Sequence, residues 1–174
     1  MLVQLKPHPD TLSEAVGRAR VDVERGAEGR LSLRYFLGGF RERLRFPAQT
    51  MPIRADELWK HTCFEAFIRG ANSEAYYEFN FAPSTQWAAY RFDRYREGMS
   101  VAYDVPPPTP QIRSRPTVFE LTVIVQLRQI PGPWRVALSA VGEDAYGAKS
   151  YWALAHPPGK PDFHHADAFV LELP

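Results

Sequence analysis

Two glutamates, Glu65 and Glu78, stand among aromatic residues in the stretch 58–99, which is the part of the sequence richest in candidate chemistry. Each belongs to a strand-like run, at 62–69 and 74–81, and residues 70–73 (Gly-Ala-Asn-Ser) form a turn between the runs. Carboxyl groups set into an aromatic surface can hydrogen-bond the hydroxyls of a small polar molecule. The stretch therefore predicts a surface that binds a small ligand, and it leaves the identity of that ligand open.

The register between these two runs decides which side chains share a face, because the side-chain period of a strand is two. If Arg69 lies opposite Glu74, the two form a favourable charge pair and the apolar side chains gather on one face. That face comprises Phe64, Ala66, Ile68, Tyr77, Phe79 and Phe81. The same register predicts Glu65 directly opposite Glu78 and Cys63 opposite Asn80. Carboxylates facing each other across a ladder repel, so solvent, a base, a cation, a shared proton or a ligand must compensate.

The second face, with Glu65, Phe67, Tyr76, Glu78 and Asn80, is open to two interpretations. It is either a solvent-exposed sheet face or a shaped binding surface, and the sequence does not choose between them. A catalytic acid–base pair is disfavoured, because cross-strand neighbours lie closer than the carboxyl groups of glycosidases do. Since no nucleophile–base pair or phosphate loop is visible elsewhere, we predict that the protein is not an enzyme.

Short strands separated by glycine and proline account for most of the remaining chain. Runs at 21–25 and 31–37 flank a Gly-Ala-Glu-Gly turn and predict a hairpin. Strict alternation of apolar and polar residues predicts a further strand over 119–127. Three more strand-like segments follow, at 134–141, 150–156 and 168–173.

One helix is predicted, over 10–20, with Asp10 or Thr11 as its cap. The tract 105–110 (VPPPTP) cannot be a central strand, and we interpret it as a rigid loop within one domain rather than as a linker. The expected fold is all-β: an antiparallel β-sandwich with jelly-roll-like topology, in a single domain spanning 1–174.

Composition restricts the function classes further. A formal net charge of +1 over 174 residues argues against a protein that binds nucleic acid by neutralising phosphates. The single cysteine, Cys63, excludes an internal disulfide and is interpreted as a buried, inert thiol. No signal peptide is visible, and no apolar stretch approaches the ~20 residues that span a bilayer. We therefore expect a cytoplasmic protein without a membrane partner, of open oligomeric state.

Three strings of the sequence resemble the DOMON-like domains related to the family 9 carbohydrate-binding modules. They are LWKHTCFEAFI at 58–68, YYEFNFAPSTQWAAYRFDRYREGM at 76–99 and SYWALAHPPGKPDFHHADAFVLEL at 150–173. The resemblance covers about 21–173 and implies an antiparallel β-sandwich that binds a sugar or haem on or between its sheets. The sugar-binding relatives hold a saccharide between two Trp rings, and the haem-binding relatives use axial Met and His.

The predicted function is non-catalytic binding of a small ligand, first a carbohydrate or sugar-derived metabolite. The predicted ligand-binding residues are Trp59, His61, Glu65, Glu78, Asn80, Trp87, His156, Lys160, Asp162 and His164. Trp59 and Trp87 are expected at the mouth of the sandwich. The loop 155–164 is either a polar site or a structural loop stiffened by prolines.

Two alternatives stay open beside sugar binding. Haem is one, with Met99 and either His61 or His156 as the axial pair. The other is a protein-interaction module or homodimer without a small ligand. No metal site is predicted, because Asp162, His164 and Asp167 show no tight ligand spacing.

Overall fold

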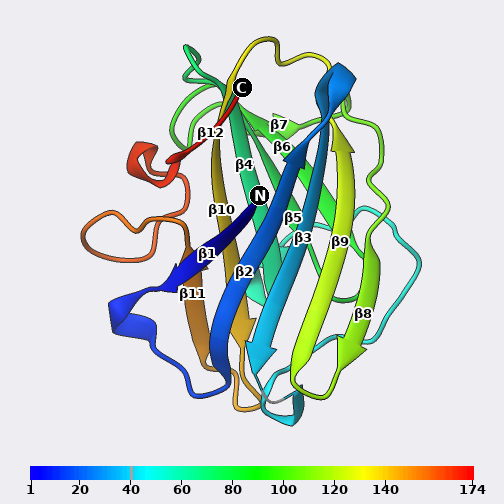
Figure 1. The fold of residues 1–174 in the computed structure, drawn as a ribbon, viewed down its shortest axis with the longest axis vertical. Helices are drawn as coiled ribbons and strands as arrows, with labels where there is room; N and C mark the ends of the chain where they lie inside the picture. The colour runs from blue at the N-terminus through cyan, green and yellow to red at the C-terminus, as the bar shows by residue number, and fades with distance from the viewer. Residues whose placement is uncertain (40) are drawn as a thin grey trace.

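Two antiparallel sheets packed face to face build the protein, as seen in a computed structural model that describes residues 1–39 and 41–174. Sheet A has the order β1-β2-β3-β9-β8, with β1 Leu2–Pro7, β2 Val16–Arg25, β3 Arg30–Gly39, β9 Val118–Gln126 and β8 Gln111–Arg115. Sheet B has the order β7-β6-β5-β4-β10-β11, with β7 Ser100–Val101, β6 Trp87–Phe92, β5 Tyr76–Phe81, β4 Cys63–Gly70, β10 Trp134–Glu143 and β11 Lys149–Ala153. Figure 1 shows β2, β3 and β9 as one layer in front of β4 and β5. The predicted all-β antiparallel sandwich is confirmed.

Strand β1 joins the two sheets. Its first part, Leu2 to Leu5, pairs with β2 in sheet A, and Lys6 and Pro7 pair with β11 in sheet B. A short strand, β12 Leu171–Leu173, completes sheet B beside β10. The helical segments of the described residues are single 3₁₀ turns: η1 Pro9–Thr11, η2 Ala27–Gly29, η3 Arg41–Arg43, η4 Leu58–Lys60 and η5 Ala166–Ala168. None of these described helices has the length or the apolar character needed to cross a bilayer.

The two sheets differ in the burial of their outer faces. In β3 and β9 buried residues alternate with partly exposed ones, so sheet A has one face on the core and one toward solvent. Every residue of β5 and the first six of β4 are buried, so both faces of sheet B are covered. One apolar cluster lies between the sheets, and a second, including Phe67, Tyr76 and Phe169, lies on the outer face of sheet B.

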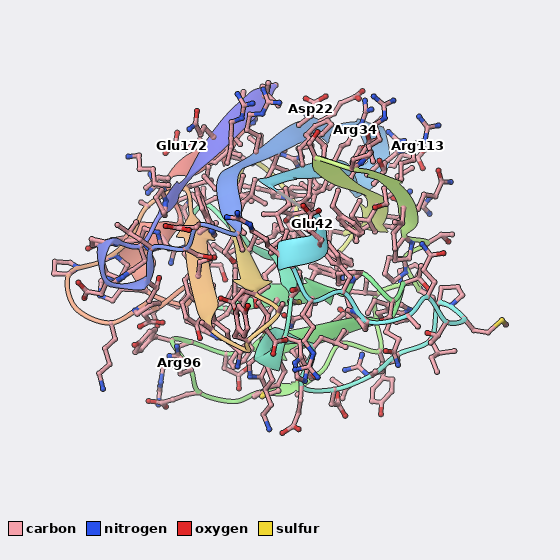
Figure 2. The ribbon with its side chains drawn as sticks, turned by 90° about the horizontal axis from the view of Figure 1, so that it is seen from below. Asp22, Arg34, Glu42, Arg96, Arg113 and Glu172 are labelled. Carbon is pink, nitrogen blue, oxygen red and sulfur yellow. The ribbon has the colours of Figure 1, made fainter. Side chains whose placement is uncertain are left out.

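The covering of sheet B comes from connecting segments. Figure 2, which views the sandwich from below, places Arg96 of the β6–β7 loop beyond sheet B. Asp22, Arg34 and Arg113 lie on the opposite side of the molecule, on the outer face of sheet A. The candidate chemistry of β4 and β5 therefore lies beneath loops, and not between the two sheets.

The predicted helix over 10–20 is wrong. Residues 9–11 form the 3₁₀ turn η1, and β2 already begins at Val16. The β2–β3 pairing shifts register between Val16 and Arg18, which is a bulge that sets Gly17 and Arg18 outward in succession. Because the bulge interrupts the period of two, the buried residues Val16 and Ala19 are three apart and imitate a helical spacing. The predicted hairpin is confirmed as β2–β3, whereas the predicted strands over 150–156 and 168–173 are shorter, as β11 and β12.

The predicted register of β4 and β5 is also wrong, by two residues. Glu65 lies opposite Asn80, and Glu78 lies opposite Phe67. The connection is longer than the four-residue turn expected, since β4 ends at Gly70 and β5 begins at Tyr76. Arg69 does not reach Glu74 and instead lies over the ring of Phe169, at 4.7 Å from its centroid.

A shift of two residues preserves the parity of every side chain. The six predicted apolar residues of these strands, Phe64, Ala66, Ile68, Tyr77, Phe79 and Phe81, all belong to the cluster between the sheets. The polar face is likewise composed as predicted, but its burial excludes the interpretation as a solvent-exposed face.

Candidate functional site

A cavity of about 410 Å³ lies on the outer face of sheet B. Strands form its floor, with Glu65 from β4, Glu78 from β5, Phe92 from β6, Val141 from β10 and Tyr151 from β11. Connecting segments form its walls, with Trp59, Arg96, Met99, Pro161, Phe163 and His164. Trp59 is 36% exposed and Met99 is 52% exposed, so the cavity reaches the surface of the protein between them.

Glu65 and Glu78 are both almost fully buried, at 3% and 5% exposure. Burial and the charge of Glu78 raise the pKa of Glu65 to about 8. Burial raises the pKa of Glu78 to about 7, although its hydrogen bond with Asn80 and the charge of Arg96 act in the other direction. The two carboxyl groups therefore change their protonation near neutral pH, which ordinary glutamates do not.

The polar partners of these carboxyl groups are Asn80, two residues from Glu78 in β5, and Ser139 of β10, the strand beside Glu65. Asn80 donates from Nδ2 to Glu78 Oε1 at 2.7 Å, and Ser139 donates from Oγ to Glu65 Oε2 at 3.1 Å. Ser139 lies opposite Glu65 in the β4–β10 ladder. Cys63 is buried as predicted, with its Sγ 3.6 Å from Asn80 Oδ1. Burial raises its pKa well above the usual thiol value, so the thiol is protonated at neutral pH and is not a nucleophile.

His164 faces Glu78 from the loop between β11 and η5. The Tyr76 hydroxyl accepts a hydrogen bond from the Arg96 backbone N–H at 3.3 Å and lies 2.7 Å from His164 Nδ1. Burial, helped by the charge of Arg96, lowers the pKa of His164 to about 4, so its ring is neutral. The Tyr76 O–H then donates to Nδ1, and the ring proton is on Nε2.

The Nε2 atom of His164 is 3.7 Å from Glu78 Oε2. This distance is too long for a hydrogen bond. Both groups therefore keep hydrogen-bonding capacity toward the cavity: one donor on the ring and one acceptor on the carboxyl.

Asp162 connects the β6–β7 loop to the loop after β11, and both loops form the cavity wall. Its Oδ2 accepts from the Tyr95 hydroxyl at 2.6 Å, and its Oδ1 accepts from Arg96 Nη2 at 2.7 Å and from the His164 backbone N–H at 3.1 Å. Asp162 is not among the lining residues. Its geometry supports a positioning role rather than the direct ligand contact predicted for it.

Several of the remaining predicted residues lie elsewhere. His61 lines a neighbouring cavity of about 420 Å³, where its Nδ1 is 2.8 Å from the buried Glu143 carboxylate. Trp87 is buried in the cluster between the sheets, so its predicted place at the mouth is wrong. Trp87 is the first residue of β6 and pairs with Phe81 of β5. Because paired residues point to the same face of a sheet, Trp87 faces the core as Phe81 does. Of the two predicted stacking residues, Trp59 alone lines the cavity.

Some residues of the loop 155–164 line the cavity, and others do not. His156 Nε2 bonds the Lys6 carbonyl at 2.9 Å, and the side chain of Lys160 is exposed without a contact to the cavity. Pro161, Phe163 and His164 do line it. The axial pairs predicted for haem are not brought together, since Met99 lines this cavity, His61 lines the neighbouring one and His156 lines neither. The described residues contain no cluster of three or more His, Cys, Asp or Glu side chains that could hold a metal ion.

Sequence reasoning placed Tyr76 on the polar face without naming it as a ligand-binding residue, and it missed Ser139 and Arg96 as parts of the site. A small polar residue inside the apolar strand 134–141 is a signal that could have identified Ser139. Arg96 has a left-handed backbone conformation, with φ 54°, and no residue pattern in the loop predicts this conformation or the place of Arg96 in the cavity lining.

No family model and no curated protein matches this chain. Among solved structures it is similar to the crystal structure of a putative carbohydrate-binding protein from Bacteroides uniformis. The two chains are 13% identical, with a TM-score of 0.65, over 97% of this chain and 84% of the other. At this identity the likeness concerns the fold, and the chain shares the antiparallel β-sandwich of that protein.

Proposed function

We propose that the cavity on the outer face of sheet B binds a saccharide or sugar-derived metabolite without catalysing a reaction on it. The observation that carries the proposal is the meeting of buried Glu65 and Glu78 with aromatic side chains in one cavity of about 410 Å³. This volume lies within the range of about 300–1,000 Å³ that is typical of small-molecule sites.

The chemistry of the cavity suits a polyhydroxylated ring. Carboxyl groups that are partly protonated near neutral pH can both donate to and accept from hydroxyls, and the His164 Nε2–H adds a donor. Trp59, Phe92 and Phe163 offer apolar surface to the carbon–hydrogen faces of a sugar. The shared fold with a putative carbohydrate-binding protein supports this choice of ligand class.

Calorimetric titration with a panel of mono- and disaccharides tests the proposal. We expect at least one sugar to bind and to raise the melting temperature, since a ligand at 100 times its Kd adds about 2.7 kcal/mol of stability. Trp59→Ala is expected to weaken binding about tenfold, through the loss of apolar contact. Tyr103→Ala, at an 89% exposed position that does not line the cavity, is the matched control and should bind normally. The proposal fails if no sugar in the panel gives a titration.

A further inference from the structure

Glu65 and Glu78 lack a basic partner among the described side chains. No described lysine or arginine nitrogen lies within 4.0 Å of either carboxyl group, and the one nearby imidazole belongs to the neutral His164. The carboxyl group of Glu65 makes a single hydrogen bond with the described residues, to Ser139. A pair of buried carboxyl groups without a cation is an unusual arrangement, because their ionised forms repel each other and are poorly solvated.

Arg96, which is the one lysine or arginine among the described lining residues, is paired with an acid. Its Nη2 pairs with Asp162 Oδ1 at 2.7 Å, and Asp162 is held in place by Tyr95. The pairing with Asp162 offsets most of the charge of Arg96, although Arg96 still acts on Glu78, so the two glutamates carry the larger charge of the cavity once they ionise. The field inside the cavity therefore favours a cation over an anion.

The hydrogen-bond partners of the two carboxyl groups also bear on the charge of the ligand. Asn80 Nδ2 and Ser139 Oγ are both hydrogen-bond donors toward the glutamate oxygens. A carboxylic acid needs an acceptor for its proton, whereas a carboxylate accepts on both oxygens. The Asn80 amide, which can only donate through Nδ2, therefore suits a carboxylate at Glu78, and the Ser139 hydroxyl, which can donate or accept, suits either form of Glu65.

Aromatic rings in the cavity lining also favour a cation. Trp59, Phe92, Tyr151 and Phe163 line the cavity around the carboxyl groups. The faces of such rings carry negative electrostatic potential and attract ammonium groups, and the attraction strengthens away from water. A cavity that combines carboxyl groups with aromatic rings is therefore suited to an organic ammonium ion.

We propose that the ligand of this cavity is an amino sugar whose protonated amine lies between Glu65 and Glu78. The inference rests on the proposed function and narrows its ligand class from saccharides in general to saccharides with a free ammonium group. The ammonium donates to the free oxygens of the two carboxylates, while the hydroxyls of the ring reach His164 Nε2 and the apolar faces pack on the aromatic walls.

Titration of matched sugars at pH 7 tests this inference. The probes are glucosamine and galactosamine, their N-acetyl derivatives, and glucose and galactose. We expect an amino sugar to bind about tenfold or more tightly than its N-acetyl and hydroxyl counterparts, because charge-assisted hydrogen bonds replace neutral ones. In Glu65→Gln and Glu78→Gln this preference should shrink to about twofold, since each variant replaces a carboxyl group that can ionise beside a bound ammonium with an amide of nearly equal volume that cannot.

Glu120→Gln on the outer face of sheet A is the matched control and should keep the preference, because Glu120 pairs with Arg34 far from the cavity. Circular dichroism and melting temperature confirm that each variant folds, and the wild-type comparison of amine with acetamide needs no variant at all. Equal binding of amino, N-acetyl and neutral sugars would overturn the amino-sugar inference and leave saccharide binding standing. Absence of binding by every sugar would overturn both.

Discussion

Asn80 lies directly opposite Glu65 in the β4–β5 ladder, and its side-chain amide donates to Glu78 at 2.7 Å. The amide therefore stands where the sequence predicted the second carboxylate, and Glu78 occupies the diagonal position. This arrangement avoids a direct carboxylate–carboxylate contact across the ladder, while both acids still line one cavity. Burial is the main cause of the raised pKa of both groups, and the charge of Glu78 raises the pKa of Glu65 further.

The stability of the ligand-free protein should fall as the pH rises from about 6.5 to 8. The pKa of Glu65 is raised to about 8 and that of Glu78 to about 7, whereas unfolded glutamate titrates near ~4.3, so the folded state binds more protons in this window. His164, whose pKa falls from 6.5 to about 4, acts with the opposite sign only below 6.5. Arg96, which faces Glu78, stays charged throughout.

Urea unfolding at pH 6.5 and pH 8 measures this effect. The double variant Glu65→Gln/Glu78→Gln should show a clearly smaller loss of unfolding free energy between the two pH values than the wild type. An identical pH dependence in the two proteins would show that the carboxyl groups do not hold their protons in the folded state.

Replacement of Asn80 by alanine should destabilise the protein by about 1–3 kcal/mol, because Glu78 loses its donor inside a buried face. Asn72→Ala, at an exposed position of the β4–β5 connection, is the matched control and should change stability by less than about 0.5 kcal/mol. Chemical denaturation measures both. Equal effects of the two variants would contradict the assigned role of the Asn80 amide.

Removal of the Asp162 carboxylate should loosen the two loops of the cavity wall. Asp162→Ala deletes the acceptor of Tyr95, Arg96 and the His164 backbone, and because Arg96 is half-exposed we expect a loss of only about 1 kcal/mol in stability. Amide hydrogen exchange should accelerate at 93–99 and 157–165 and stay unchanged in β4 and β5. Glu24→Ala, at an exposed position of β2 in sheet A, provides the comparison and should leave both loops protected.

Gly98 should tolerate no side chain in the loop that carries Arg96 and Met99. Its φ is +68°, and a Cβ there would collide with the Asp93 carboxylate, so Gly98→Ala is expected to cost about 2 kcal/mol or more. Gly132 has a similar φ of +70° with open space around it, and Gly132→Ala isolates the cost of the backbone conformation alone. Thermal unfolding that ranks the two variants equally would mean that the collision is relieved by movement of Asp93.

The sequence by itself determined which side chains share a face. Side-chain parity in a strand depends on the backbone of that strand alone, so the apolar set of β4 and β5 and the polar set with Glu65, Glu78 and Asn80 are both as predicted. The same local rule failed in β2, where a bulge at Val16–Arg18 interrupts the period.

Only the tertiary structure decided the register and the covering of the polar face. A two-residue shift leaves parity unchanged, so no local pattern distinguishes Asn80 from Glu78 as the partner of Glu65. Trp59, Arg96 and His164 reach the carboxyl groups from three connecting segments far apart in the chain, and their meeting depends on the packing of loops over sheet B. Burial under those loops gives the two glutamates their protonation near neutral pH, because the cost of a buried charge is a property of the surroundings and not of the residue.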